Sequence, residues 1–218
     1  GTLQKGEDFI INSLKTLKPG GIAVHTTEYN ISFQSWKQWC NKNDTQMFLL
    51  EEPIVPMDEM HIIWQRYFMF DIFEANEIES DQTLIVDADT IVHPECPNFF
   101  DETDGKYCLV HDDGSYDWIL RGMEHYSKYV YDGAWFDFWK YGNSGFQIVN
   151  NKHREFFDYM REFYFENNEM IRSIQDNYGI GTDQTPLNYN LILKNIPVKL
   201  LSYKYNMTCM YKKEILAD

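Results

Sequence analysis

The sequence predicts an α/β fold with a mostly parallel central sheet that is flanked by helices on both faces. Apolar runs of strand length alternate with longer segments of helical periodicity along the 218 residues. The strand-length runs are apolar throughout rather than alternating, which is typical of strands that are buried on both faces of a parallel sheet. Both observations favour a single sheet that is covered by helices on both faces.

The first half of the chain follows the order helix, strand, helix, strand, helix. Residues 7–17 have apolar side chains at helical spacing, and a Pro-Gly-Gly sequence ends the helix that they predict. A buried strand is expected at 22–24, a helix at 32–41 and a second strand at 47–50. Apolar residues at helical spacing then predict one long helix at 57–78.

The second half adds the remaining strands and helices. Apolar runs predict strands at 83–86, 107–110, 146–149 and 197–201. Amphipathic segments predict helices at 151–167 and 183–194. The aromatic-rich, glycine-punctuated segment 112–142 is expected to form a long functional loop or a region of short helices. In an open α/β sheet, ligands bind outside the carboxyl ends of the strands, and polar residues gather after several of these runs.

Composition limits the classes of function. The formal net charge of −15 disfavours nucleic acid and anionic lipid as partners, because both call for basic patches. The four cysteines lack disulfide or zinc spacing, and neither a signal peptide nor a transmembrane segment is recognisable. A cytoplasmic protein is therefore expected. We expect one domain over 1–218; because the chain begins with Gly1 rather than Met, a larger multidomain protein stays open as its source.

Two acids directly follow the apolar run at 84–86. The sequence there reads TLIVDADTIVHP, with Asp87 and Asp89 on either side of Ala88. Strand alternation would place both carboxylates on one side of the strand end, with the alanine opposite. Paired carboxylates suit Mg²⁺ or Mn²⁺, which favour oxygen ligands. A solvated turn after a buried strand is the alternative, and the pair alone does not decide between them.

The same acids also resemble the first motif of haloacid-dehalogenase-type phosphatases. In that alternative Asp87 would be the nucleophile of a phosphohydrolase and Asp89 its acid-base group. The rest of the chain fits this family less well. It requires a later lysine and a late acidic pair, whereas Asp112-Asp113 follows too soon and two strands precede the motif.

Five ordered segments between about residues 22 and 211 resemble metal-dependent nucleotide-sugar glycosyltransferases of the Rossmann-like GT-A fold. The nearest likeness is to family 8 and its relatives, including chlorella-virus enzymes. The segments are HTTEY at 25–29, WQRYFMFDIF at 64–73, LIVDADTIVHP at 84–94, NSGFQIVN at 143–150 and GTDQTPLNY at 181–189.

The resemblance implies a UDP-sugar donor, a saccharide or other hydroxyl acceptor, and Mn²⁺ or Mg²⁺ held by Asp87 and Asp89. Asp183 and Gln184 would be the catalytic pair, and the Asp-Gln segment slightly favours retention. Donor contacts are expected from His25, Thr26, Thr27, Tyr29, Arg66, Asp87, Ala88, Asn143 and Gly145.

Several of these residues have simpler interpretations. Arg66 could be a core-helix arginine that reaches water, and His25 a strand-end histidine without a catalytic role. Asn143 and Gly145 could form only a turn, and Asp183 could only cap the helix that follows it. The aromatic set could be core or a platform for the acceptor sugar; it comprises Trp118, Tyr126, Trp135, Phe136 and Trp139.

Two segments depart from the glycosyltransferase pattern. Many relatives place a third metal ligand, often histidine, near the C-terminus, but the last histidine here is His153, and only Asn206, Cys209 and Met210 are available later. The segment INSLKTLKPGGIAVHTTEYN at 11–30 also resembles the late helix-loop-strand of class I methyltransferases, so residues 1–20 could be a remnant of an upstream domain of that kind. The glycine-rich cofactor loop of a methyltransferase is missing, which argues against methyl transfer.

Overall fold

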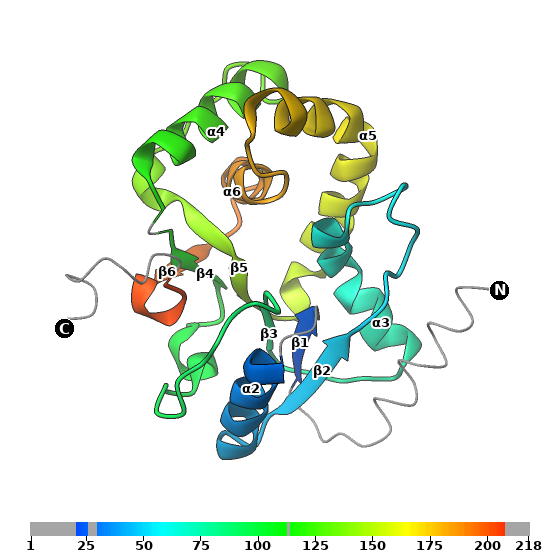
Figure 1. Ribbon diagram of the computed structural model, residues 1–218, viewed down its shortest axis with the longest axis vertical. Helices are drawn as coiled ribbons and strands as arrows, with labels where there is room; N and C mark the ends of the chain where they lie inside the picture. The colour runs from blue at the N-terminus through cyan, green and yellow to red at the C-terminus, as the bar shows by residue number, and fades with distance from the viewer. Residues whose placement is uncertain (1–20, 26–29, 113, 208–218) are drawn as a thin grey trace.

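The computed structural model describes residues 21–25, 30–112 and 114–207 (Figure 1). Within these ranges, six strands form one sheet in the order β2-β1-β3-β5-β4-β6. The strands are β1 (Gly21–His25), β2 (Gln46–Leu50), β3 (Thr83–Val86), β4 (Tyr107–His111), β5 (Gly142–Val149) and β6 (Val198–Leu201). Each lies on or next to an apolar run that predicted it. The predicted helix at 7–17 lies outside the described residues.

The sheet is mixed, which corrects the expectation of a mostly parallel arrangement at its centre. β1 pairs in parallel with β2 and β3, and β4 pairs in parallel with β6. β5 lies between β3 and β4 and runs antiparallel to both, with Val86 opposite Phe146. A short apolar run indicates a buried strand but not its direction. As a result, the start of β5 lies beside the end of β3.

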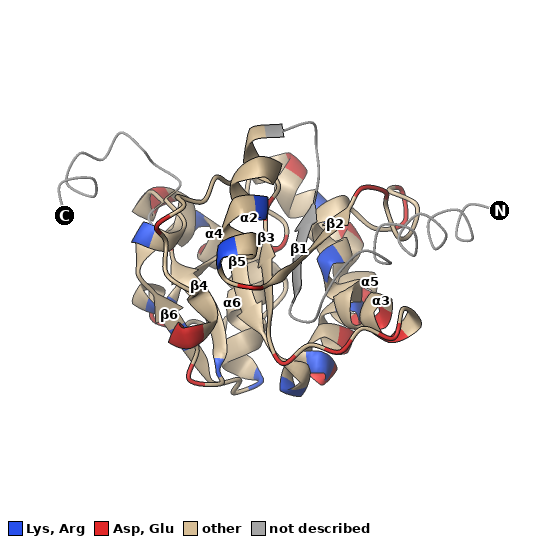
Figure 2. Ribbon diagram, turned by 90° about the horizontal axis from the view of Figure 1, so that it is seen from below, with Lys and Arg blue, Asp and Glu red and all other residues tan. Residues whose placement is uncertain are grey.

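Helices cover both faces of the sheet, as predicted. The α-helices described are α2 (Asn30–Lys42), α3 (Met69–Ala75), α4 (Tyr116–Tyr129), α5 (Arg154–Tyr178) and α6 (Gln184–Leu193). Short 3-10 helices lie at η1 (Ile62–Phe68), η2 (Phe99–Glu102), η3 (Phe138–Lys140), η4 (Asn151–His153) and η5 (Tyr203–Tyr205). In Figure 2, α2 lies on one side of the sheet and α6 on the other. None of the helices in the described ranges is both long and apolar enough to cross a membrane.

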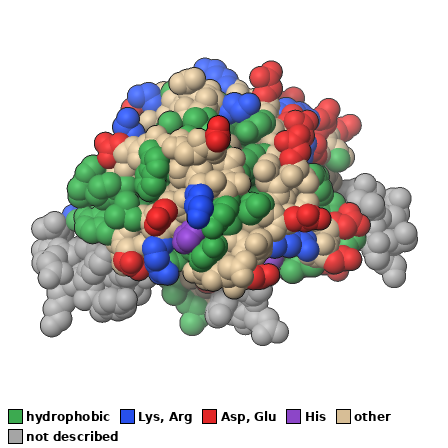
Figure 3. Space-filling view, turned by 90° about the horizontal axis from the view of Figure 1, so that it is seen from above, with side chains coloured by type: hydrophobic (Ala, Val, Ile, Leu, Met, Phe, Trp, Pro, Cys, Tyr) green, Lys and Arg blue, Asp and Glu red, His purple; other side chains and the backbone are tan. Residues whose placement is uncertain are grey.

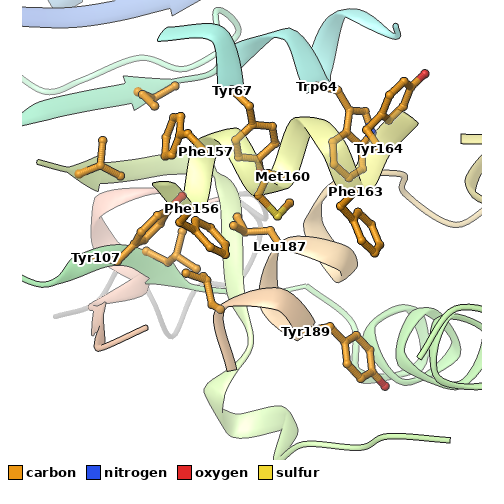
Figure 4. Close-up of a cluster of buried hydrophobic side chains, with 14 of the residues drawn as sticks. Trp64, Tyr67, Tyr107, Phe156, Phe157, Met160, Phe163, Tyr164, Leu187 and Tyr189 are labelled. Atoms are coloured by element: carbon orange, nitrogen blue, oxygen red, sulfur yellow. The ribbon is translucent and has the colours of Figure 1, made fainter. Parts of the chain in front are cut away.

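Strand alternation divides the core into two layers. On β3, Leu84 and Val86 pack with Trp36 of α2, whereas Ile85 faces the larger layer beneath η1 and α3–α6. Aromatic rings dominate that larger layer (Figure 4). The ring of Phe157 meets Tyr67 edge-on, with centroids 5.2 Å apart. Burial of each ring stabilises the fold by about 1.5–3 kcal/mol. The layer therefore holds η1 against α5 and fixes the positions of the side chains on η1.

The helix predicted at 57–78 is broken and shorter than expected. Helical backbone begins only at η1, and the α-helical part is α3. The buried Gln65 side chain explains the late start, because its amide bonds the backbone of Ile54, Val55 and Met60. These contacts hold the preceding segment in turns, which periodicity alone cannot reveal.

Three further boundaries differ from the prediction. The segment 112–142 contains the 14-residue helix α4, which begins where Ser115 accepts a hydrogen bond from the Trp118 amide. β5 begins at Gly142, four residues before the predicted strand. α5 continues to Tyr178 and ends at Gly179, whose φ of 63° is a left-handed conformation that suits glycine.

Candidate active site

Arg66 is the buried cation of the candidate site. Its side chain is only 2% exposed, and it donates three hydrogen bonds: Nε to the Ile63 carbonyl at 2.8 Å, Nη1 to the Ser144 carbonyl at 2.5 Å, and Nη2 to Asp87 Oδ1 at 2.8 Å. Burial alone would lower the Arg66 pKa, but the charges of Asp87 and Asp183 outweigh it and the pKa is raised. The structure therefore rules out an arginine whose head reaches bulk water.

Asp87 begins a turn at the end of β3. Its carbonyl accepts hydrogen bonds from the Thr90 amide at 3.2 Å and the Thr90 hydroxyl at 2.6 Å. Its own amide donates to the Gly145 carbonyl at 3.0 Å. Since the strand has ended, alternation does not place Asp89 beside Asp87. The Asp87 carboxylate is half-exposed and bound to Arg66, whereas Asp89 is exposed.

Position 145 lies so close to the Asp87 carboxylate that glycine, which has no Cβ atom, suits it best. A Cβ atom at this position would lie 2.5 Å from Asp87 Oδ2 and 3.0 Å from Asn143 Oδ1. Asn143 Oδ1 also accepts a hydrogen bond from the Gly145 amide at 2.8 Å. Both residues lie inside β5, so the interpretation of this segment as only a turn is wrong.

Asp183 is the second acid near Arg66. It is 5% exposed, and its Oδ2 atom has no hydrogen-bond partner among the described residues. Burial raises its pKa, the charge of Arg66 lowers it, and the charge of Asp87 raises it further; the net shift is upward. Asp183 stands immediately before α6 but makes no side-chain capping hydrogen bond. A helix cap therefore does not account for this aspartate.

A hydrogen-bonded network joins Asp183's neighbour Gln184 to the end of β4. Gln184 Nε2 donates to Asp112 Oδ2 at 2.7 Å, and Gln184 Oε1 accepts from the Ser144 amide at 2.9 Å. Asn143 Nδ2 reaches the same Asp112 oxygen at 3.3 Å. Asn206 Nδ2 donates to Asn143 Oδ1 at 2.9 Å. These contacts hold the end of β4, the start of β5 and the start of α6 together.

The structure brings six of the predicted residues into one site: Arg66, Asp87, Asn143, Gly145, Asp183 and Gln184. Ala88 is half-buried and packs toward the core layer under α2. His25 ends β1, but its side chain lies outside the described part of the chain, as do Thr26, Thr27 and Tyr29. Their predicted nucleotide contacts stay predictions.

Sequence reasoning did not assign Asp112 or Ser144 to the site, and it named Asn206 only as a possible late metal ligand. Asp112 directly follows β4 as Asp87 follows β3, so an acid after a buried strand was a usable signal for it. Ser144 contributes its carbonyl to Arg66 and its amide to Gln184, and backbone contacts leave no sequence signal. Asn206 meets Asn143 across 63 positions of the chain, and its type alone does not indicate that contact.

A divalent ion at Asp87 and Asp89 would have few protein ligands. Within the described ranges, no three His, Cys, Asp or Glu side chains cluster closely enough to hold a metal ion. Mg²⁺ and Mn²⁺ commonly bind through one or two carboxylates together with water and substrate phosphates. An ion held by these two acids would therefore need further ligands from water or from a substrate phosphate.

The fold resembles that of a solved glycosyltransferase. A comparison with solved structures finds this likeness in the crystal structure of a glycosyltransferase involved in the glycosylation of the major capsid of PBCV-1. The TM-score is 0.54 at 12% sequence identity, and the match covers 90% of each chain. No family model matches the chain, and no curated protein sequence matches it. The similarity confirms the predicted likeness to a glycosyltransferase fold, whereas the prediction of a mostly parallel sheet was wrong.

Proposed function

We propose that this chain is a glycosyltransferase that takes its sugar from a nucleoside-diphosphate sugar, most simply UDP-linked, and transfers it to a saccharide or other hydroxyl acceptor. The observation that carries this proposal is the charge cluster at the end of β3. There, one buried guanidinium, Arg66, is flanked by the carboxylates of Asp87 and Asp183. The cluster lies at the strand end where open α/β sheets bind ligands.

Arg66 acts as a positioning residue in this proposal. Its three hydrogen bonds fix the guanidinium to η1, to β5 and to Asp87 Oδ1. The second oxygen of Asp87 is then the one that faces Gly145, where the missing side chain leaves room. Asp87 would use its exposed part toward the donor's ribose or toward a metal ion.

The proposed Mn²⁺ or Mg²⁺ would be held by Asp87, Asp89 and the donor's diphosphate. When bound, such an ion neutralises the negative charge that develops on the departing diphosphate. The protein's own acids would otherwise repel that charge, since the chain has a formal net charge of −15. Because the protein would supply only two carboxylate ligands, ion binding is expected to be weak without nucleotide.

Asp183 would act on the sugar. In the reaction the bond from C1 of the sugar to the diphosphate oxygen breaks, a bond from C1 to the acceptor oxygen forms, and the acceptor hydroxyl loses its proton. A buried carboxylate with a free oxygen can stabilise positive charge at C1 in a retaining enzyme or accept that proton in an inverting one. We favour retention because Asp183-Gln184 followed by Asn188 resembles retaining families.

The test is a panel of nucleotide sugars scored for hydrolysis with Mn²⁺, with Mg²⁺ and with EDTA. We expect one UDP-sugar to be hydrolysed in the presence of Mn²⁺ and Asp183→Asn to slow the reaction by about 10²-fold or more. Asp117→Asn is the matched control, because Asp117 is an exposed aspartate outside the site and should leave the rate unchanged. A panel without any hydrolysed or bound donor would refute the proposal.

A further inference from the structure

Three aromatic side chains form a cluster at the surface where α4 begins. Tyr116 is 58% exposed and Trp139 is 55% exposed. Their rings meet edge-on, with centroids 5.8 Å apart and planes at 79°, and Phe138 packs against both at 5.5 and 4.3 Å. We call Tyr116, Phe138 and Trp139 the aromatic patch. Contiguous exposed aromatic surface is uncommon on soluble proteins and generally marks a site of interaction.

The aromatic patch is attached to the candidate active site through the end of β4. His111 Nε2 lies 3.0 Å from the Trp139 carbonyl oxygen, and the next residue is Asp112. Asp112 Oδ1 accepts a hydrogen bond from the Gly114 amide at 2.6 Å, which fixes the entry to α4 and hence Tyr116. The carboxylate that holds Gln184 in the site thus also positions one end of the patch.

The rings are held in place although they are exposed. Trp139 receives support from Asp137, whose Oδ1 accepts a hydrogen bond from the Trp139 amide at 3.1 Å. The three rings also restrain one another, with centroids 5.8 Å apart for Tyr116 and Trp139, 5.5 Å for Tyr116 and Phe138, and 4.3 Å for Phe138 and Trp139. Fixed aromatic faces lose little conformational entropy when a flat ligand stacks on them.

The chemistry of the patch suits an uncharged saccharide. Pyranose rings present C–H faces that pack on aromatic rings, and their hydroxyl groups stay in water. The charges near the patch balance: Arg121 lies 3.0 Å from Asp117 on the first turns of α4, and the exposed Asp137 and Lys140 on either side of Phe138 and Trp139 have opposite signs. Figure 3 shows hydrophobic side chains gathered at the left of the molecule, on the side of α4, and acidic ones at the right. A net charge of −15 would also repel a polyanionic glycan.

We propose that the aromatic patch binds a sugar ring of an uncharged saccharide acceptor. This inference rests on the proposed glycosyl transfer and adds the class of acceptor and the surface that receives it. Binding there would hold the acceptor at the rim of the site that contains Asp112, Gln184 and Asp183. The sequence alone leaves open whether all the aromatic residues between 118 and 139 belong to the core. They do not, because Tyr126 is fully buried whereas Trp135 and Trp139 are exposed.

The test separates acceptor binding from donor chemistry. Wild type, Trp139→Ala, Tyr116→Ala and the ring-retaining Tyr116→Phe are measured for hydrolysis of the UDP-sugar, for transfer, and for binding to an array of neutral oligosaccharides without donor. We expect the two alanine variants to lose about tenfold in array binding and in transfer, with donor hydrolysis within about twofold of wild type. Tyr116→Phe should retain both. Phe165→Ala is the matched control, because Phe165 is an aromatic residue of α5, 49% exposed and outside the patch.

The outcomes for the two proposals are distinct. If wild type neither hydrolyses nor binds any nucleotide sugar, glycosyl transfer fails, but loss of array binding in Trp139→Ala would still support the patch. The patch proposal is overturned if wild type binds none of the neutral oligosaccharides, or if the alanine variants bind and transfer as wild type does. It is also overturned if those variants change only the self-association of the protein in sedimentation, since the patch would then be a protein contact.

Discussion

The Nη2 atom of Arg66 lies 2.8 Å from Asp87 Oδ1, and the two partners differ sharply in exposure, with 2% of the arginine side chain and 41% of the aspartate side chain accessible to solvent. The pair therefore joins the core to the open end of the sheet. A buried arginine needs its partner to offset the cost of burial, whereas the aspartate is free to contact a ligand with its other oxygen.

The first prediction concerns this pair. Asp87→Ala should lower the free energy of unfolding by about 2 kcal/mol, because it leaves Arg66 buried beside an empty position; water near the half-exposed site limits the loss. Asp87→Asn keeps an oxygen that can accept from Arg66 and should cost less than about 1 kcal/mol. Urea denaturation of both variants measures the difference.

The control is an exposed ion pair. Asp117→Ala breaks the contact with Arg121, in which both side chains are largely exposed, and should cost less than about 0.5 kcal/mol. If Asp87→Ala costs as little as this control, the buried pair does not stabilise the fold in the way that its geometry implies.

The second prediction concerns glycine in β5. A methyl group at Gly145 would meet the Asp87 side chain, so Gly145→Ala should move that carboxylate, reduce UDP binding at least tenfold and lower stability only modestly. Gly142→Ala instead meets Leu109 Cβ at 2.6 Å in the core and should destabilise by about 1–3 kcal/mol. Calorimetric UDP titration and thermal melting compare the two. A loss of stability in Gly145→Ala equal to that in Gly142→Ala would contradict the prediction.

The sequence predicted the strands well because their apolar runs are unambiguous. Residues 83–86 are all buried and form β3 with the predicted bounds. Short local motifs also led to residues that the structure brings near one another, among them Asp87, Asn143 and Asp183, whose functional roles stay predictions. Both successes rest on local information, since a strand is a short apolar run and each motif spans only a few neighbouring residues.

What failed depends on contacts between distant segments. The direction of β5 is set by pairing with β3 and β4, and the break before η1 is set by where the Gln65 amide finds its partners. Asp112 and Asn206 join the site only because the sheet brings their segments beside Asn143. Local periodicity contains no information about such contacts.

The third prediction concerns the metal ion. Asp89 is exposed, and no ion pair or hydrogen bond of its side chain is found among the described residues, so Asp89→Asn should leave the melting temperature unchanged. It should weaken Mn²⁺-dependent UDP binding at least tenfold, because one of two carboxylate ligands is lost. Calorimetric titration with Mn²⁺ and with EDTA checks this. UDP binding that is indifferent to EDTA would remove the ion from the proposal.

The fourth prediction separates transfer from the phosphohydrolase alternative. A nucleophilic Asp87 would hydrolyse phosphate monoesters and form an adduct with beryllofluoride. Because Asp87 Oδ1 is held by Arg66 and the fold resembles that of a solved glycosyltransferase, we expect neither. We expect UDP with Mn²⁺ to stabilise the protein by about 2.7 kcal/mol at a hundredfold excess over Kd. A monoesterase rate that disappears in Asp87→Asn would favour the phosphohydrolase.

The last prediction concerns Asp183 and the pH dependence of stability. Burial raises the pKa of this carboxyl above its ordinary value of 3.8. The folded protein therefore binds the proton more tightly than the unfolded chain, and stability decreases as pH rises from 3.8 through the folded pKa. Asp183→Asn lacks this ionisation, so it should be at least as stable as wild type at pH 7, and the difference should diminish as pH falls. Urea denaturation between pH 7 and pH 4 measures it, and parallel stability curves would contradict it. Since Asp183 makes no capping hydrogen bond, the variant should also avoid the loss of about 1 kcal/mol that follows removal of a helix cap. Turnover should nevertheless fall by about 10²-fold or more with UDP affinity unchanged, because only the sugar-facing charge is removed.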